Sequence, residues 1–283
     1  MNLEKMNNMF IHLFFVHTNI GDNMKALMTG ATSGIGYALA LKLVKNGDIV
    51  YLCVHNDKEI KTVINKLKLD GYQDRVSVIE LDITNKRDRD KIKNLDADCL
   101  VSFAAVGIGG SLVNMELSDI RDNFEVNFFS TLELIKLYIE TRKNKKGRIV
   151  VVSSVASLMP ISFLGSYSST KAALSNFVTC LSRELKKSKL DIDIKLVEPG
   201  LYRTGFNQVM IDSKNELNSE LFTSNMEQIS QKQRKLFAFF EYKSLVSIVD
   251  KIYNAIKSDS NKLIYRAPLL QVMGLKLYLL LFK

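Results

Sequence analysis

The chain of 283 residues contains only three prolines, three cysteines and three histidines. Without Pro-, Gly- or Ser-rich stretches, the sequence shows no linker between domains. Cys53, Cys99 and Cys180 are odd in number and far apart, which excludes a disulfide framework and CxxC-type metal spacing. We therefore expect reduced, buried thiols in a single-domain cytoplasmic protein that binds no metal.

The histidines exclude two classes of hydrolase. His12 and His17 lie close to the start of the chain, and His55 lies near the end of an apolar run. None of them stands where a Ser-His-Asp triad or an HExxH zinc site would need it.

The formal charge of +9 would attract a nucleic acid, an anionic membrane surface or a phosphorylated ligand, and charge alone does not choose among them. The densest basic run, residues 142–148, has no interleaved aromatic residues on which bases could stack. We interpret this run as a solvated turn and expect no nucleic-acid partner.

Residues 1–23 precede the first recognisable strand. Their apolar stretch, residues 9–16, is too short to span a bilayer, and the residues after it offer no good signal-peptide cleavage site. We interpret 1–23 as an extension without a catalytic role.

The C-terminal tail, residues 266–283, is apolar. As a helix, residues 268–283 would be roughly 24 Å long, shorter than a bilayer core of about 30 Å. The tail therefore suits peripheral contact with a membrane surface or packing against a subunit.

From Lys25 onward, apolar runs of strand length alternate with segments of helical spacing or length. This alternation predicts an α/β fold with a doubly wound parallel sheet and ligands at the carboxyl ends of the strands. We assign residues 24–265 to one domain, in which about 201–240 form a lid. The expected strands are 26–28, 49–54, 76–81, 99–103, 149–152, 192–197 and 263–265, and a further helix is expected at about 241–257.

Tyr167 and Lys171 form a Tyr-Ser-Ser-Thr-Lys sequence. A phenol with a pKa of about 10 is a poor acid or base at neutral pH unless a fixed cation stabilises the phenolate. Residues four apart share one face of a helix, so Lys171 can supply that cation. Because such a pair also arises by chance, the motif carries weight only together with others.

A second motif, Thr29-Gly-Ala-Thr-Ser-Gly-Ile-Gly36, follows a strand and opens a helix. Glycines at such a turn let the backbone approach a pyrophosphate, and the helix N-terminus supplies donors and a favourable dipole. Together with Ser154, Tyr167-x3-Lys171 and Pro199-Gly200, this string resembles the short-chain dehydrogenase/reductase family over roughly 24–265. The resemblance implies a Rossmann fold and NAD(P)-dependent interconversion of an alcohol and a carbonyl.

The resemblance also implies roles for single residues. Tyr167 would be the general acid/base, Ser154 would hold the substrate oxygen, and Lys171 would lower the tyrosine pKa and bind the nicotinamide ribose. Asn127 would hold a water on a proton relay to Lys171. Ser153 is one residue off the family spacing and is the less favoured serine.

For the cofactor, the resemblance places Asp82 at the adenine ring and Thr204 near the nicotinamide carboxamide. Asp82 could instead cap the next helix, and Thr204 could be a lid hydroxyl without a ligand. The complete set expected at the cofactor is Gly30, Thr32, Ser33, Gly34, Ile35, Gly36, His55, Asp82, Ile83, Ala104, Tyr167, Lys171, Pro199, Gly200 and Thr204.

Two departures from the family pattern matter. Ser102-Phe-Ala-Ala105 replaces the usual Asn-Asn-Ala-Gly, which puts the affinity and local geometry of cofactor binding in question. The second strand ends without an acidic residue at Val54 to accept a hydrogen bond from the ribose 2′-OH, which favours NADP(H) over NAD(H). Ser33 and His55 stand where NADP-preferring relatives often carry Arg or Lys, so the preference is soft, and nearby Asp57 argues for NAD(H).

The predicted lid is rich in apolar residues, which favours a hydrophobic or acyl-type carbonyl or alcohol over a sugar. The same side chains would also suit packing within the lid or against a subunit, since relatives usually form homodimers or homotetramers. A rival interpretation is a cofactor-sensing or scaffold protein that keeps the fold without turnover. The apolar lid residues are Phe206, Met210, Leu221, Phe222, Met226, Leu236, Phe237, Phe239 and Phe240.

Overall fold

The computed structural model describes residues 23–213 and 226–281, and its centre is one parallel sheet. The strand order is β3-β2-β1-β4-β5-β6-β7, and every neighbouring pair is parallel. The predicted doubly wound fold is confirmed. The strands are β1 Lys25–Thr29, β2 Ile49–Val54, β3 Val76–Glu80, β4 Cys99–Ser102, β5 Gly147–Val152, β6 Ile192–Pro199 and β7 Ile264–Ala267.

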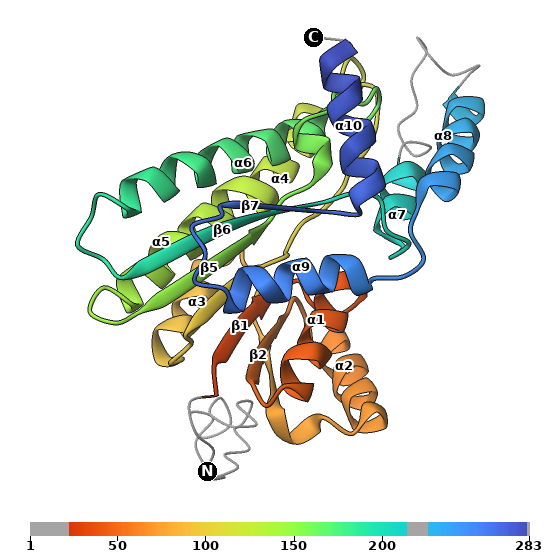
Figure 1. Ribbon diagram of the computed structural model, residues 1–283. Helices are drawn as coiled ribbons and strands as arrows, with labels where there is room; N and C mark the ends of the chain where they lie inside the picture. Colours follow the sequence, from red (N-terminus) through yellow and green to blue (C-terminus); the bar gives the residue numbers. More distant parts are fainter. Residues whose placement is uncertain (1–22, 214–225, 282–283) are drawn as a thin grey trace.

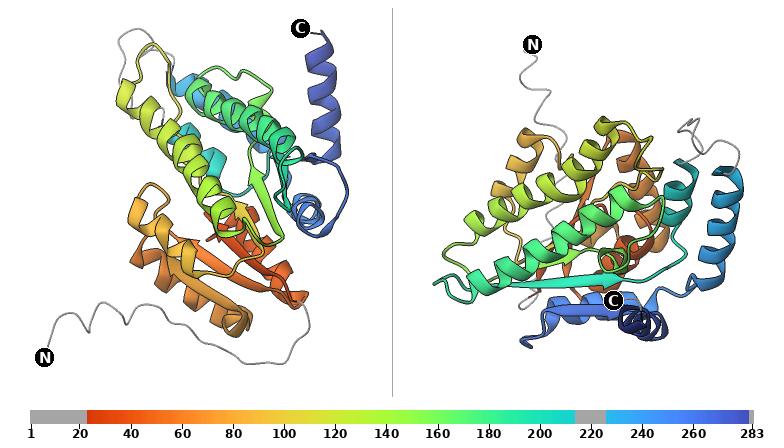
Figure 2. Two further views of the ribbon diagram at one scale, coloured as in Figure 1. Left: turned by 90° about the vertical axis from the view of Figure 1, so that its left-hand side faces the viewer. Right: turned by 90° about the horizontal axis from the view of Figure 1, so that it is seen from above.

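Helices cover both faces of this sheet (Figures 1 and 2). On one face, α1, α2 and α9 pack on alternate strand residues such as Ala26 and Met28. On the other face, α5 and α6 pack on the intervening residues, such as Leu27. The longer helices are α1 Gly34–Lys45, α2 Asp57–Asp70, α4 Leu117–Phe124, α5 Thr131–Thr141, α6 Gly165–Leu185, α8 Met226–Phe240, α9 Val246–Lys257 and α10 Leu269–Leu281; shorter elements are α3 Lys86–Asp90, α7 Phe206–Asp212 and a π-helix at Glu125–Ser130.

Local sequence explains where several helices begin and end. Asn56 caps α2 by accepting from the Glu59 amide at 3.1 Å, and Gly71 ends that helix with a φ of 75°. In α9 the apolar residues recur at helical spacing, so a single stripe that includes Ile248, Ile252 and Ile256 is buried against the sheet.

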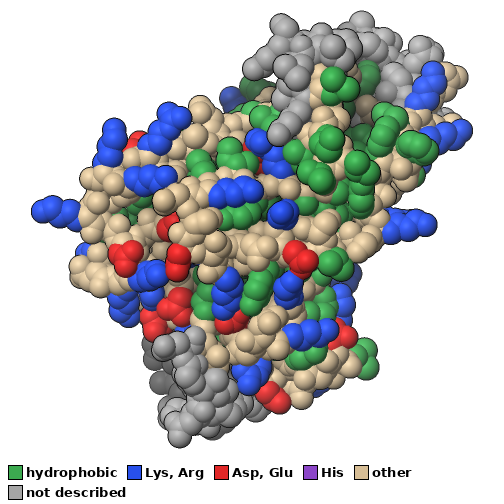
Figure 3. Space-filling view, in the orientation of Figure 1, with side chains coloured by type: hydrophobic (Ala, Val, Ile, Leu, Met, Phe, Trp, Pro, Cys, Tyr) green, Lys and Arg blue, Asp and Glu red, His purple; other side chains and the backbone are tan. Residues whose placement is uncertain are grey.

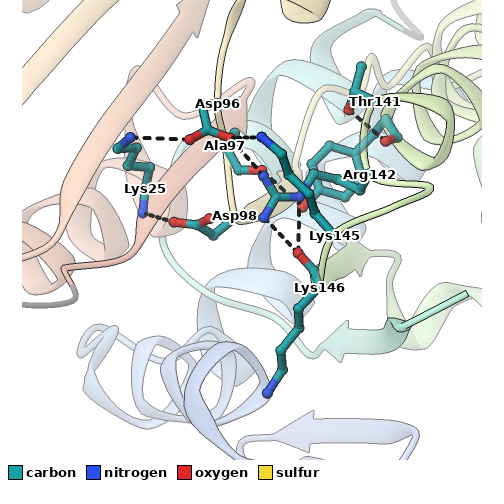
Figure 4. Close-up of polar contacts among 9 residues, drawn as sticks. Lys25, Asp96, Ala97, Asp98, Thr141, Arg142, Lys145 and Lys146 are labelled. Carbon is teal, nitrogen blue, oxygen red and sulfur yellow. Dashed lines mark hydrogen bonds and ion pairs between the residues drawn. The ribbon is translucent and has the colours of Figure 1, made fainter.

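The basic run does form a turn, between α5 and β5, but its first residue is not solvated as predicted. Arg142 is buried, and its guanidinium pairs with Asp96 at 2.9 Å and with Asp98 at 3.0 Å (Figure 4). It also donates to the Lys146 carbonyl, while Asp98 accepts from the Lys25 amide. Part of the basic run therefore joins the amino ends of β1, β4 and β5.

Cys53 and Cys99 are buried as expected, but Cys180 is exposed on α6. Within the described residues, no group of His, Cys, Asp and Glu side chains could hold a metal ion. None of the described helices is both long enough and apolar enough to span a bilayer. Residues 1–22, which make up nearly all of the predicted extension, lie outside the described residues.

Candidate functional site

The strand order places the turn after β1 beside the end of β4, where the direction of strand addition reverses. Gly30 has a φ of 64°, and a Cβ on it would lie 2.5 Å from the Ala104 Cα. Gly34 has a φ of 54°, and a Cβ there would lie 3.1 Å from the Thr204 side chain. Larger residues would therefore be strained at both positions and would push apart the two segments that frame the turn.

The same turn presents a helix N-terminus to the cleft. Ser33 is the N-cap residue of α1 and makes no capping bond with its side chain. The first amides of a helix have no partner within the helix, so a bound anion can accept from them. A cleft of about 450 Å³ opens here, lined by Gly30, Ser33, Gly34, Ile35, Gly36, Phe103, Ala105, Val152, Ser153, Ser154, Tyr167, Lys171, Pro199, Gly200, Tyr202, Thr204, Gly205, Phe206, Asn207 and Val209.

Tyr167 and Lys171 reach this cleft from the first turns of α6. Both are buried, and the Lys171 Nζ lies 5.7 Å from the centre of the Tyr167 ring. That ammonium also donates to the Val152 carbonyl at 3.4 Å. Ser154 begins the turn after β5, where its Oγ accepts from the Ala156 amide at 3.1 Å. The cleft thus brings together a phenol, an ammonium group and a hydroxyl from two separate segments.

Burial favours the neutral form of both ionisable groups. It raises the pKa of Tyr167 to about 12, against a smaller lowering by a hydrogen bond from Ser154. It lowers the pKa of Lys171 to about 8. The resemblance predicts that Lys171 lowers the tyrosine pKa, whereas here the lowering contribution comes from Ser154 and burial exceeds it.

Asn127 lies in the π-helix and is fully buried. Its Oδ1 accepts from the Val106 amide at 2.8 Å, and its Nδ2 donates to the Val106 carbonyl and to Thr170 Oγ1. Asn123 holds Ile108 in the same two-sided manner, so two amides fix the loop after β4. Asn127 does not line the cleft, and sequence reasoning missed the parallel role of Asn123.

The predicted adenine-side residues lie at the ends of β2 and β3 rather than in the lined cleft. Asp82 Oδ1 accepts from both the amide and the hydroxyl of Thr84, and Asp82 Oδ2 lies 3.6 Å from His55 Nε2. Ile83 is buried. Thr32, within the glycine turn, and Ala104, packed against Gly30, do not line the cleft either.

The altered segment after β4 keeps the backbone close to the turn. Ser102 is buried, while Phe103 and Ala105 line the cleft. The sequence analysis did not predict that Phe103, Tyr202 and Asn207 line the cleft. Phe103 directly follows the end of β4, and Tyr202 and Asn207 lie in the predicted lid, so their positions in the sequence could have indicated it.

The lid helix α7 lies directly over the site. The Phe206 ring is 5.7 Å from the Tyr167 ring, and a Cβ on Gly107 would lie 3.1 Å from Phe206 and 3.2 Å from the Met210 sulfur. Phe237 is also buried in this cluster.

Three other predicted lid residues do not line the cleft. Leu236, Phe239 and Phe240 of α8 are exposed. Leu221 and Phe222 lie outside the described residues, and so does the side chain of Met226.

Comparison with known proteins gives a consistent result. The sequence profile described as short chain dehydrogenase matches residues 24–215. Estradiol 17-beta-dehydrogenase 2 of Rattus norvegicus is 32% identical over 194 residues, which are 65% of this chain and 49% of that protein. The chain therefore spans about half the length of this curated relative.

Two solved structures share the fold. A short chain dehydrogenase/reductase from Burkholderia phymatum in complex with NAD superposes with a TM-score of 0.76 at 20% identity, covering 90% of this chain and 92% of that one. A short chain dehydrogenase from Burkholderia cenocepacia J2315 in complex with NADP has a TM-score of 0.68 at 19% identity, covering 92% and 98%.

Proposed function

Since the chain belongs to the short-chain dehydrogenase family, we propose that it is an NAD(P)-dependent oxidoreductase that interconverts an alcohol and a carbonyl. The observation that carries the proposal is the meeting of Tyr167, Lys171 and Ser154 beside a glycine turn and a helix N-terminus in one cleft. Such a cleft offers both a place for a dinucleotide and a proton donor for the substrate.

The chain's own residues would divide the work as follows. Ser154 donates to the substrate oxygen, Tyr167 transfers the proton to or from that oxygen, and Lys171 stabilises negative charge on the phenolate. Asn127 supports them indirectly, because it fixes the loop after β4 and bonds to Thr170 beside Lys171. When bound, the nicotinamide supplies the hydride.

The residues around the turn fit a dinucleotide. The tight approach at Gly30 and the uncapped start of α1 suit a pyrophosphate, and Lys171 and Thr204 line the cleft where the nicotinamide half would lie. We favour NADP(H) because β2 ends without an acid at Val54 and His55 is exposed there.

A hydrophobic or acyl-type substrate suits the apolar wall that Phe206, Met210 and Val209 place next to Tyr167. The similarity to an estradiol dehydrogenase supports the same class. Such a substrate gains most from burial against aromatic and aliphatic side chains.

The test measures binding of NADPH and NADH to the purified protein, followed by turnover of a panel of hydrophobic and polar carbonyls. We expect tight NADPH binding and reduction of hydrophobic carbonyls that is lost in Tyr167→Phe. Tyr138→Phe is the matched control, because Tyr138 is a buried tyrosine whose hydroxyl bonds to Ala97 away from the cleft. Cofactor binding without turnover of any carbonyl would favour the sensor or scaffold alternative, and preference for sugars would refute the substrate class.

A partner surface is also proposed for the C-terminal helix. Figure 3 shows hydrophobic side chains gathered over α7, α8 and α10, and Leu269, Leu270, Met273 and Leu277 of α10 are exposed. We favour contact with a second subunit or with a membrane surface. Deleting residues 268–283 separates the two: a changed oligomeric state indicates assembly, and loss of vesicle binding with an unchanged state indicates a membrane contact.

A further inference from the structure

Behind the wall of the cleft lies a buried carboxylate that the proposed mechanism does not use. Glu198, at the end of β6, is 1% exposed. It pairs in register with Arg266 of β7, whose Nε and Nη2 both lie 2.6 Å from Glu198 Oε2. An ion pair taken this far from water is costly unless further hydrogen bonds satisfy the carboxylate.

Two serine hydroxyls provide those hydrogen bonds at the other carboxylate oxygen. Ser175 Oγ lies 3.0 Å and Ser157 Oγ lies 3.1 Å from Glu198 Oε1. Ser175 belongs to α6, one turn beyond Lys171, and Ser157 belongs to the turn that Ser154 begins. The carboxylate therefore joins the two segments that carry the cleft's polar side chains.

The network continues to the backbone of the proposed catalytic residues. Ser157 Oγ lies 2.7 Å from the Ser154 carbonyl, so its single proton is shared between that carbonyl and Glu198. Ser175 Oγ lies 2.8 Å from Ser153 Oγ, which in turn donates to the Lys171 carbonyl at 3.1 Å. Ser153 and Ser175 have one hydroxyl proton each, so two of the three contacts, Ser175 with Glu198, Ser175 with Ser153 and Ser153 with the Lys171 carbonyl, are hydrogen bonds at one time.

We infer that Glu198, Arg266 and Ser175 form a positioning network that sets the distance between Ser154 and the Tyr167–Lys171 helix. The inference rests on the proposed function. Each link of the network ends on the backbone or the neighbouring turn of a proposed catalytic residue, and none reaches the reacting atoms. A displacement of about 1 Å in such a site can cost about a hundredfold in rate.

The experiment uses Ser175→Ala, which removes the link to α6 and leaves the ion pair intact. We expect kcat to fall by about tenfold with little change in NADPH affinity or in the substrate KM, since reacting groups are misaligned rather than lost. Ser175→Thr keeps the hydroxyl and should restore kcat. Ser182→Ala is the control, because Ser182 is a buried serine two turns further along α6 and outside the network.

A second measurement does not depend on turnover. Amide hydrogen exchange of peptides covering residues 152–158 should be faster in Ser175→Ala than in Ser182→Ala, because the turn at Ser154 loses its tie to α6. Unchanged exchange would refute the network whether or not the protein reduces carbonyls. If exchange rises and the wild-type protein reduces a carbonyl, an unchanged kcat in Ser175→Ala would also refute the network. If the wild-type protein reduces no carbonyl, only the proposed function is refuted.

Discussion

Burial of Lys171 has a consequence for pH dependence. With a pKa lowered to about 8 by the loss of hydration, the ammonium is charged at neutral pH and loses its proton in the mildly alkaline range. Tyr167, with a pKa raised to about 12 by burial, stays protonated over the same range. The charge of the lysine, rather than that of the phenol, therefore changes first as the pH rises.

Carbonyl reduction should accordingly be level up to about pH 8 and decline above it, as Lys171 becomes neutral. Lys171→Met should lower kcat by about a hundredfold or more, as expected when general acid catalysis is impaired, and should remove the decline. A pH profile of kcat at saturating cofactor checks both. Persistence of the same decline in Lys171→Met would show that another group titrates there.

A second prediction for a single residue concerns His55 and the choice between NADP(H) and NAD(H). Its side chain is exposed near Asp82, and the proposed NADP(H) preference expects the 2′-phosphate there. His55→Asp should weaken NADPH binding by about tenfold or more and leave NADH binding nearly unchanged, because a carboxylate repels the phosphate and can accept from a 2′-OH. His55→Asn, which removes the ring without adding charge, is the control. Equal losses for both cofactors would contradict the NADP preference.

At the scale of the elements, Gln271 joins α10 to the lid by hydrogen bonds. Gln271 Oε1 accepts from the Leu201 amide at 2.7 Å, and its Nε2 donates to the Phe240 carbonyl at 2.6 Å. The carbonyl oxygen also fills the space where a Cβ on Gly200 would stand, at 2.1 Å. The C-terminal helix thus fixes both the end of α8 and the turn that follows β6.

Gln271→Ala should loosen α8. Each lost hydrogen bond contributes about 1 kcal/mol, so amide exchange in α8 should accelerate by about tenfold. Hydrogen exchange followed by mass spectrometry measures this directly. Gln208→Ala is the control, since the hydrogen-bond partner of Gln208 among the described residues is Asp212 of the same helix; an equal effect of the two substitutions would show that Gln271 does not hold α8.

For the whole molecule, the end of the sheet opposite the cleft supports stability rather than chemistry. Arg142 is buried between Asp96, Asp98 and the Lys146 carbonyl, where it links three strands (Figure 4). The guanidinium is buried but the two carboxylates are exposed, so removing Arg142 loses charged hydrogen bonds without leaving a buried charge unpaired.

Arg142→Met should therefore lower the free energy of unfolding by about 2 kcal/mol, because the hydrogen bonds of a buried guanidinium to charged and carbonyl groups are lost. Lys145→Met should change it by less than about 1 kcal/mol, because Lys145 is exposed and its pair with Asp96 lies at the surface. Urea unfolding measures both values. NADPH affinity should be unchanged in the two variants, and a selective loss of affinity in Arg142→Met would refute the separation of stability from function.

The sequence determined the order of strands and helices, because runs such as Ile49–Val54 are buried on both sides of a parallel sheet and so read as continuous apolar segments. It also determined part of the cleft, since the glycine turn and the Tyr167–Lys171 spacing act through local geometry. Local patterns of this kind can be recognised in the sequence without knowledge of the rest of the fold.

The tertiary structure alone decided the properties that depend on distant contacts. The pKa values of Tyr167 and Lys171 follow from their burial, and Arg142 pairs with carboxylates on another loop. Glu198 reads in the sequence only as the residue before Pro199. Its place between Arg266, Ser157 and Ser175 arises because β6, β7 and α6 meet there, and no local pattern encodes that meeting.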